Sequence, residues 1–387
     1  MIDFSLPDES RLLIDTVRRF IESEVRPLEE ETDRTGIVPP DALRRVKAQA
    51  QELGLYAMNM PTEVGGGGLS SVDHCLVEEE FGKTSDALIR RVFGQVYPML
   101  TECQGDQIEK YLKPTVRGEL ICAIAITEPG AGSDAASIAT TAHREGDEWV
   151  LNGTKHFISD GDIADYVIVM ALTDADKRAR GGITLFLVDS GTPGFRVARI
   201  QEMMGHRGYG HAELVFDNCR IPAHAVLGEV GNGFTLIMQS VLEVRLAHIG
   251  ARAVGMASRA LDMMRRHAAD RQQFGQPIGN FQMVQKMIAD SAIEIFGVKM
   301  MVYNAAWEFD QGLNPRNKVS MIKVAASEMQ GRVVDRAIQV YGGMGFTKEV
   351  PLERMYRDAR VTRIYDGTSE IHRMLIARST IKHGLNL

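Results

Sequence analysis

Apolar residues recur at helical spacing at both ends of the chain. In the first stretch, Leu13, Val17, Phe20, Ile21 and Val25 follow one another at intervals that place them on one face of a helix. Similar spacing predicts helices over residues 41–53 and 72–81, and long amphipathic helices over residues 234–267, 281–311, 318–341 and 371–382. The long C-terminal helices are typical of a bundle.

The middle of the chain follows a different pattern. Short apolar runs, typical of buried strands, occupy residues 120–126, 149–151, 166–170, 183–188 and 212–216. Glycine, asparagine and aspartate separate these runs at close spacing, which favours an antiparallel sheet or barrel over a parallel sheet. We therefore expect an α+β protein: an N-terminal helical domain (1–117), a middle antiparallel β domain (118–230) and a C-terminal helical domain of four-helix-bundle type (231–387).

Composition narrows the functional classes. The 387 residues are 44% hydrophobic and 25% charged, which is typical of globular proteins, and the net charge of −7 disfavours nucleic-acid binding. No apolar run reaches the roughly 18 residues of a membrane span, and no signal peptide is evident. The four cysteines form no C-x-x-C pair and no metal motif occurs, so we expect no metal. A cytoplasmic location is expected, with a mitochondrial matrix location left open.

Two segments carry candidate chemistry. Residues 127–134 (TEPGAGSD) directly follow a predicted strand, and their small residues and hydroxyl groups suit either a phosphate or polar ring edge, or simply a tight loop. Residues 364–370 (IYDGTSE) place Asp366 just before a helix expected to begin near Thr368. At that position a carboxylate serves either as a helix cap or as a positioned base.

These segments, with three others, resemble the motifs of the acyl-CoA dehydrogenase family over nearly the whole chain. The other three are NGTKHFIS at residues 152–159, RQQFG at 271–275 and QVYGGMGF at 339–346. The resemblance implies the family's helix–strand–helix fold, FAD as cofactor and an acyl-CoA thioester as substrate. It also implies at least a dimer, commonly a homotetramer built as a dimer of dimers, and an electron-transfer flavoprotein as electron acceptor.

The resemblance assigns a role to each matching residue. Asp366 is the catalytic base, and the substrate contacts include Ser133, Arg245 and Gly367. Cofactor contacts within one subunit are assigned to Ile126, Thr127, Ser133, Phe157, Ser159, Thr368 and Glu370, and contacts to a neighbouring subunit's FAD to Arg271, Gln273, Phe274, Gln339, Gly342 and Gly343. The base would remove the α-proton while a β-hydride passes to flavin N5, forming an α,β-unsaturated acyl-CoA. A buried base should have a raised pKa.

The chain departs from the family pattern near the substrate. Asp366 stands where the family usually has Glu, which shortens the side chain by about 1.5 Å. The base position used by a second subgroup holds Val244, and the neighbouring Glu243 is a weaker alternative because it points elsewhere on its helix. Leu242 replaces an Asp that contacts the CoA arm in many relatives. Asp366 therefore remains the best candidate for the base.

Arg90 and Arg91 lie in a stretch that lines the acyl pocket in relatives. Arg91, alone or with Arg90, would bind a distal carboxylate of the acyl group; alternatively, one or both are solvated residues of a helix surface. We therefore expect a dehydrogenase for a branched, cyclic or carboxylated acyl group. The alternatives are a nitroalkane oxidase-like flavin oxidase of small carbon acids, an enoyl-CoA reductase and a non-catalytic flavin-fold partner.

Overall fold

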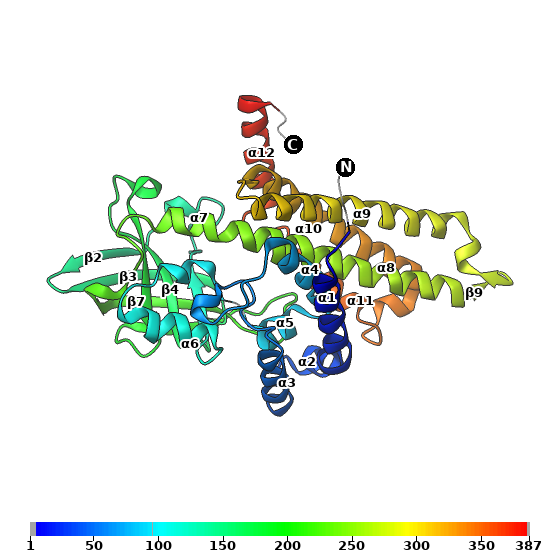
Figure 1. Ribbon diagram of the computed structural model, residues 1–387, viewed down its shortest axis with the longest axis horizontal. Helices are drawn as coiled ribbons and strands as arrows, with labels where there is room; N and C mark the ends of the chain where they lie inside the picture. Colours follow the sequence, from blue (N-terminus) through cyan, green and yellow to red (C-terminus); the bar gives the residue numbers. More distant parts are fainter. Residues whose placement is uncertain (1–4, 95, 385–387) are drawn as a thin grey trace.

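The computed structural model describes residues 5–94 and 96–384, and it shows an elongated molecule with a β-sheet at one end and long helices along the rest (Figure 1). The N-terminal part is helical, as expected. After α1 the chain passes through a π-helical stretch (η1) and a 3-10 turn (η2), which contains Pro27, into the next helix. The elements are α1 (Asp8–Phe20), η1 (Ile21–Val25), η2 (Arg26–Leu28), α2 (Glu29–Thr35), α3 (Pro40–Glu52), α4 (Ser71–Phe81), α5 (Asp86–Val92) and α6 (Lys113–Val116).

The middle part forms one eight-stranded, mostly antiparallel sheet, which confirms the expected fold class. Its order is β6-β7-β3-β2-β4-β5-β8, and β1 pairs with β4 in parallel. Both faces of β4 and β5 are covered, so successive side chains are buried whichever face they point to, which explains the continuous apolar sequences of these strands. The strands are β1 (Cys122–Ala125), β2 (Thr141–Glu145), β3 (Glu148–Ser159), β4 (Tyr166–Leu172), β5 (Ile183–Asp189), β6 (Phe195–Ile200), β7 (His211–Pro222) and β8 (Val226–Leu227).

The C-terminal part consists of long helices that run lengthwise through the molecule. A continuous helical rod leaves the sheet and includes a π-helical stretch, η9, in its middle. A small β9–β10 hairpin lies at the end farthest from the sheet (Figure 1). The elements are α7 (Gly233–Glu243), η9 (Val244–Ala251), α8 (Arg252–Asp270), β9 (Gln272–Gln273), β10 (Gln276–Pro277), α9 (Gln282–Asp310), α10 (Arg316–Tyr341), η11 (Gly342–Phe346), α11 (Leu352–Val361) and α12 (Ser369–His383).

Two glycines bring α4 and α8 into backbone contact. A Cβ atom on Gly255 of α8 would lie 1.9 Å from the carbonyl oxygen of Glu79, and one on Gly82 would lie 2.1 Å from the carbonyl oxygen of Arg252. No side chain fits between the two backbones at this crossing. The close approach holds the N-terminal helices against the rod and sets the position of the residues that α4 and α8 present to each other.

We expect Gly255→Val to lower the free energy of unfolding by about 3 kcal/mol, because the added atoms force the α4–α8 crossing apart. Gly331→Ala in α10 is the matched control, since a Cβ there meets no atom within 4 Å. That control should be neutral or stabilise the protein by up to about 1 kcal/mol. Denaturant unfolding followed by circular dichroism measures both; equal effects of the two variants would contradict the close crossing.

Candidate functional site

Asp366 lies in a tight turn between α11 and α12. Its φ is +53° and that of Gly367 is +90°, so both residues adopt the left-handed conformation, which aspartate tolerates better than most residues. The carbonyl oxygen of Asp366 accepts hydrogen bonds from Nε of Arg245 at 2.8 Å and Nε2 of His372 at 3.1 Å. The carbonyl oxygen of Gly367 accepts one from Nζ of Lys323. Side chains from three helical elements therefore hold this turn.

The helix-cap interpretation of Asp366 is wrong. The side chain of Thr368 caps α12, accepting a hydrogen bond from the backbone N–H of Ile371 at 3.3 Å. The carboxyl group of Asp366 is thereby available for another role.

The surroundings of the Asp366 carboxyl group favour a proton acceptor. Burial raises its pKa, against the opposing effect of Arg245, Lys323 and Arg90. Burial also lowers the pKa of Lys323 to about 8 and that of His372 to about 4, so the imidazole is neutral at pH 7. The raised pKa agrees with the expectation for a buried base.

The loop after β1 is anchored to β3 by a buried ion pair. Nζ of Lys155, a residue with 0% exposure, lies 2.8 Å from Oε1 of Glu128 and donates to the carbonyl oxygen of Ile126 at 3.0 Å. Glu128 also accepts the backbone N–H groups of Ala139 and Thr140. The backbone N–H of His156 donates to the carbonyl oxygen of Thr127 at 2.8 Å. These bonds bring the first two predicted flavin segments side by side.

The sequence motifs did not predict a role for Lys155 or Glu128, although Glu128 lies in TEPGAGSD and Lys155 in NGTKHFIS. The feature that could have identified them is the presence of opposite charges in two motifs that both adjoin apolar strands. They act as positioning residues, because they touch the loop rather than the space in front of it.

A β-bulge aims Phe157 out of the sheet. The register of β3 against β7 shifts between Lys155 and Ile158, and Phe157 has a φ of +59° and is 50% exposed. Its ring stacks on that of His156 at a centroid distance of 4.0 Å. Oγ of Ser159 lies 3.2 Å from Nδ1 of His211. An exposed aromatic face beside the open loop at Gly130 and Gly132, where a Cβ would meet nothing within 4 Å, fits the edge of a flavin.

The remaining predicted cofactor residues divide into two groups. Thr368 and Glu370 begin α12, near the Asp366 turn. Arg271, Gln273 and Phe274 belong to the hairpin at the end of the molecule farthest from the sheet (Figure 1), where Phe274 is 93% exposed. Gln339, Gly342 and Gly343 lie near that same end, because the Tyr341 ring stacks on His267 of α8 at 4.1 Å. One copy of the chain does not bring the two groups together, as the resemblance implied.

Three of the four predicted substrate residues, Arg245, Gly367 and Arg91, make polar contacts within the protein. Arg245 is engaged with the Asp366 carbonyl group, and Ser133 is exposed in the anchored loop. Arg90 Nε and Arg91 NH2 lie 2.9 Å and 2.7 Å from the Asp160 carboxylate, and both arginines are largely buried. The solvated-surface alternative for this pair is therefore wrong. Binding of a distal carboxylate by Arg91 stays a prediction, and Asp160 already balances part of its charge.

The two residues discussed above that precede Val244, Leu242 and Glu243, both contact neighbouring parts of the helical domain. Leu242 is buried in the helical core, and Oε1 of Glu243 lies 3.3 Å from Nδ1 of His74. Glu243 is thus engaged with α4. The four cysteines are buried and free. In the described part of the chain, no helix combines the length and apolar character that crossing a membrane requires.

Comparison with known proteins agrees with this arrangement. Family models match in chain order: the acyl-CoA dehydrogenase N-terminal domain at residues 7–119, the middle domain at 123–219 and the C-terminal domain at 231–381. The chain is 39% identical to acryloyl-CoA reductase (NADH) of Anaerotignum propionicum, over 98% of this chain and 96% of that protein. It is 38% identical to human mitochondrial short-chain specific acyl-CoA dehydrogenase, over 96% and 90% respectively.

Among solved structures, butyryl-CoA dehydrogenase from Megasphaera elsdenii superimposes with a TM-score of 0.89 at 32% identity, covering 98% of this chain and 100% of that one. Sequence, domain order and fold lead to the same result. The chain belongs to the acyl-CoA dehydrogenase family, the FAD-dependent oxidoreductases that act on CoA thioesters.

Proposed function

We propose that this enzyme acts on the Cα–Cβ bond of a short acyl-CoA, with Asp366 as the base that takes the α-proton. The observation that carries the proposal is the Asp366 turn. It presents a carboxyl group of raised pKa on a backbone held by Arg245, His372 and Lys323. A base needs both a fixed position and a pKa closer to neutrality than that of a free carboxylate.

Different residues of the chain would have different roles in the reaction. Ile126, Thr127, Phe157 and Ser159 would hold the FAD ring, which when bound supplies the hydride acceptor. The Lys155–Glu128 ion pair fixes the loop that carries the first two of these residues. The backbone N–H of Asp366 would donate to the thioester oxygen and stabilise the negative charge that develops there. The largely buried walls exclude water from the carboxyl group and so keep its pKa raised.

The direction of the reaction and the electron partner are part of the proposal. We favour dehydrogenation, with an electron-transfer flavoprotein taking the electrons. The similarity to acryloyl-CoA reductase (NADH) supports a second candidate, reduction of an enoyl-CoA at the same site. The four free buried cysteines fit the expected cytoplasmic location.

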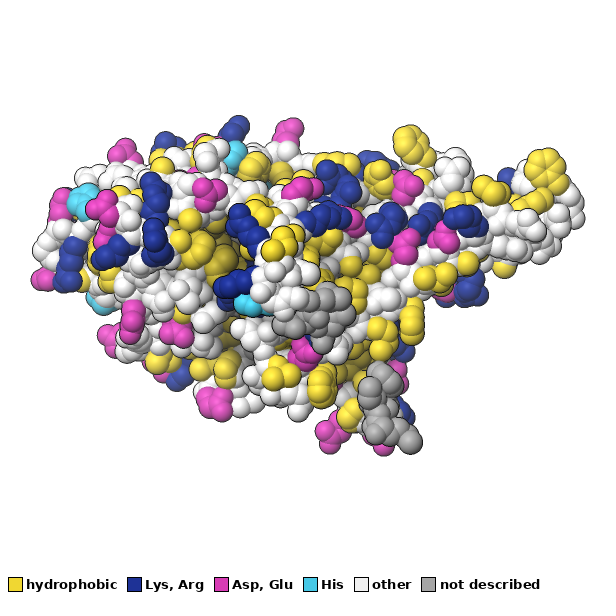
Figure 2. Space-filling view, turned by 90° about the horizontal axis from the view of Figure 1, so that it is seen from above, with side chains coloured by type: hydrophobic (Ala, Val, Ile, Leu, Met, Phe, Trp, Pro, Cys, Tyr) yellow, Lys and Arg dark blue, Asp and Glu magenta, His cyan; other side chains and the backbone are white. Residues whose placement is uncertain are grey.

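The proposed cofactor site requires several copies of the chain. Within one copy, the residues near the Asp366 turn and the residues near the β9–β10 hairpin lie too far apart to hold one FAD together. The outer face of α9 carries large exposed apolar side chains at helical spacing: Ile293, Phe296, Met300 and Trp307. Figure 2 shows apolar side chains standing out along the helices and at the hairpin end. A row of this kind favours association with another copy, and we propose a homotetramer.

We expect Asp366→Asn to slow flavin reduction by an acyl-CoA at least about 10²-fold, because the amide cannot accept the proton. The flavin spectrum of the purified variant should show FAD still bound. In the wild type, the rate of reduction should rise with pH through the raised pKa of Asp366, since only the ionised carboxylate is a base. Asp366→Glu is the control that keeps this pH dependence; an Asn variant that reacts at the wild-type rate would rule out Asp366 as the base.

Anaerobic titration with a panel of acyl-CoAs and nitroalkanes tests the substrate class. We expect short acyl-CoAs to bleach the flavin absorbance and nitroalkanes to leave it unchanged. Bleaching by nitroalkanes alone would replace the proposal with a carbon-acid oxidase. Re-oxidation of the reduced enzyme by an enoyl-CoA, faster than by electron-transfer flavoprotein, would favour the reductase direction.

The double substitution of Phe296 and Trp307 by Asp should lower the molar mass measured by light scattering, because charged groups replace the apolar row on α9. FAD should be lost together with the assembly. Leu12→Asp is the matched control, since Leu12 is a single exposed apolar residue on α1. A double variant that stays assembled and yellow would show that α9 is not the interface.

A further inference from the structure

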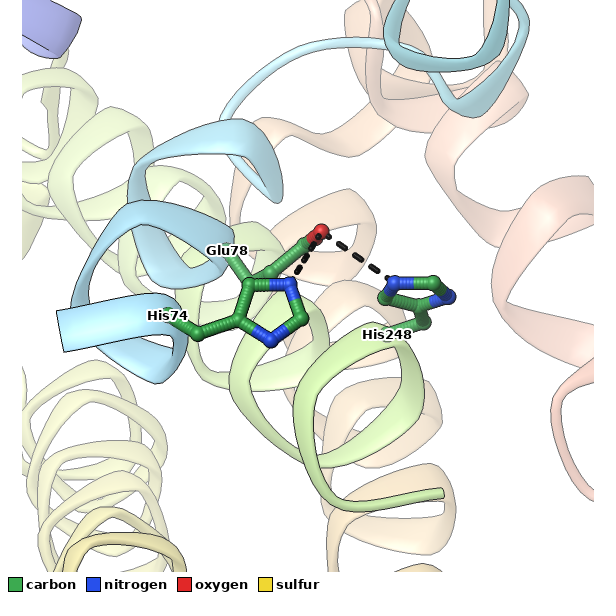
Figure 3. Close-up of side chains that lie close together, drawn as sticks. All are labelled: His74, Glu78 and His248. Atoms are coloured by element: carbon green, nitrogen blue, oxygen red, sulfur yellow. Dashed lines mark ion pairs between the residues drawn. The ribbon is translucent and has the colours of Figure 1, made fainter. Parts of the chain in front are cut away.

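A group of buried and half-buried polar side chains lies where α4, α5 and the helical rod pack together. This distal cluster consists of His74 and Glu78 of α4, Asp86 of α5, His248 of η9 and Arg252 of α8. Oε1 of Glu78 lies 3.5 Å from Nε2 of His74 and 3.4 Å from Nε2 of His248 (Figure 3). Arg252 donates to both Glu78 and Asp86, the latter at 2.9 Å. Such a concentration of charge is unexpected beside the site of an aliphatic acyl chain.

One polar atom of the distal cluster is unpartnered. Burial lowers the pKa of His248 to about 3, so its ring is neutral at pH 7. Its Nε2 faces the Glu78 carboxylate and must carry the hydrogen, which leaves a lone pair on Nδ1. Within the described part of the chain, this buried Nδ1 has no hydrogen-bond partner, and it points away from Glu78 (Figure 3). It is an acceptor that requires a donor.

A cavity next to His248 provides the space for that donor. Its volume is about 30 Å³, and its lining includes Asp86, His248, Arg252 and Tyr365, the residue before Asp366. This volume accommodates one or two groups the size of water. A second cavity, of about 20 Å³, touches the same histidine from the α4 side.

The same two helical elements, α5 and η9, carry residues at the cavity and residues that act on the base. On α5, Arg90 is close enough to influence the pKa of Asp366, and Asp86 is one turn earlier, at the cavity. On η9, Arg245 contacts the Asp366 carbonyl group and His248 is one turn later. One turn is about 5.4 Å, which is the reach of roughly four carbon–carbon bonds. π-helical stretches such as η9 are frequent at functional sites.

The charges around the cavity determine which donor fits. An ammonium group would be repelled by Arg252, and a carboxylate would face Asp86 and Glu78 and has no hydrogen to donate. A metal ion on His74, Glu78 and His248 is disfavoured, because Arg252 occupies the Glu78 carboxylate. In addition, Glu243 and Glu78 outweigh burial and raise the pKa of His74 to about 9, which protonates this ligand. A neutral hydroxyl group meets these conditions.

We propose that the enzyme prefers a short acyl group that carries a hydroxyl group near its far end, donated to Nδ1 of His248. This inference rests on the proposed function, since it assumes that the acyl group passes Asp366 into the cavity. It makes His248 a specificity residue and limits the acyl group to about six carbons.

The test compares acyl-CoAs that differ only by the terminal hydroxyl: butyryl, valeryl and hexanoyl-CoA against their 4-, 5- and 6-hydroxy forms. We expect kcat/KM for flavin reduction to be at least about tenfold higher with the hydroxyl at one of these lengths. Calorimetry on Asp366→Asn, which should bind without reacting, should show the same preference in Kd. His248→Leu should abolish the preference, and His248→Gln, which keeps an acceptor, should restore part of it.

His143→Leu on exposed β2 is the matched control and should keep the wild-type ratio. An unchanged ratio in His248→Leu, or no wild-type preference at any length, would overturn the inference and assign Nδ1 to an ordered water. If His248→Leu does not fold, the wild-type ratios and His248→Gln still decide. Plain acyl-CoAs that reduce the flavin without a hydroxyl preference would remove this inference alone, whereas a flavin that no acyl-CoA reduces would remove the proposed function as well.

Discussion

The site depends on the hydrogen bonds that hold two consecutive backbone carbonyl groups, those of Asp366 and Gly367. Arg245, His372 and Lys323 approach them from η9, α12 and α10. Arg245 and Lys323 are charged donors, and hydrogen bonds from charged donors are roughly twice as strong as neutral ones, so these two can hold both residues in a left-handed conformation. The same cations oppose the rise in the carboxyl pKa, but burial outweighs them. The turn is rigid without forcing the base to stay ionised.

Buried ion pairs recur around this turn. Lys155 pairs with Glu128 at the loop after β1, Arg90 and Arg91 pair with Asp160, and the distal cluster joins Arg252 to two carboxylates. Ion pairs of this kind contribute little net stability, since desolvation offsets much of their attraction, but removing one partner is costly. We infer that they fix the relative positions of the site's walls rather than stabilise the fold.

The long helices explain why one chain does not complete the proposed cofactor site. α10 has 26 residues, which corresponds to about 39 Å. Its first half carries Lys323, beside the Asp366 turn, and its end carries Gln339, near the hairpin. A helix of this length cannot bend to bring its ends together. Residues at the two ends meet a common ligand only when copies of the chain lie side by side.

The sequence alone determined the order of helices, strands and helices, the family, and the position of Asp366 before the last helix. These properties depend on neighbours along the chain: apolar periodicity, and motifs in which each residue is close to the next. Only the tertiary structure decided that Thr368 rather than Asp366 caps α12, that Asp160 pairs with both arginines, and that Glu128 and Lys155 anchor the loop after β1. It also decided the environment of His248. Each of the pairings depends on local geometry or on contacts between segments far apart in the sequence. The hydrogen bond from Arg245 to Asp366, for example, joins residues 121 positions apart. The spacing of apolar residues along the chain does not reveal such contacts.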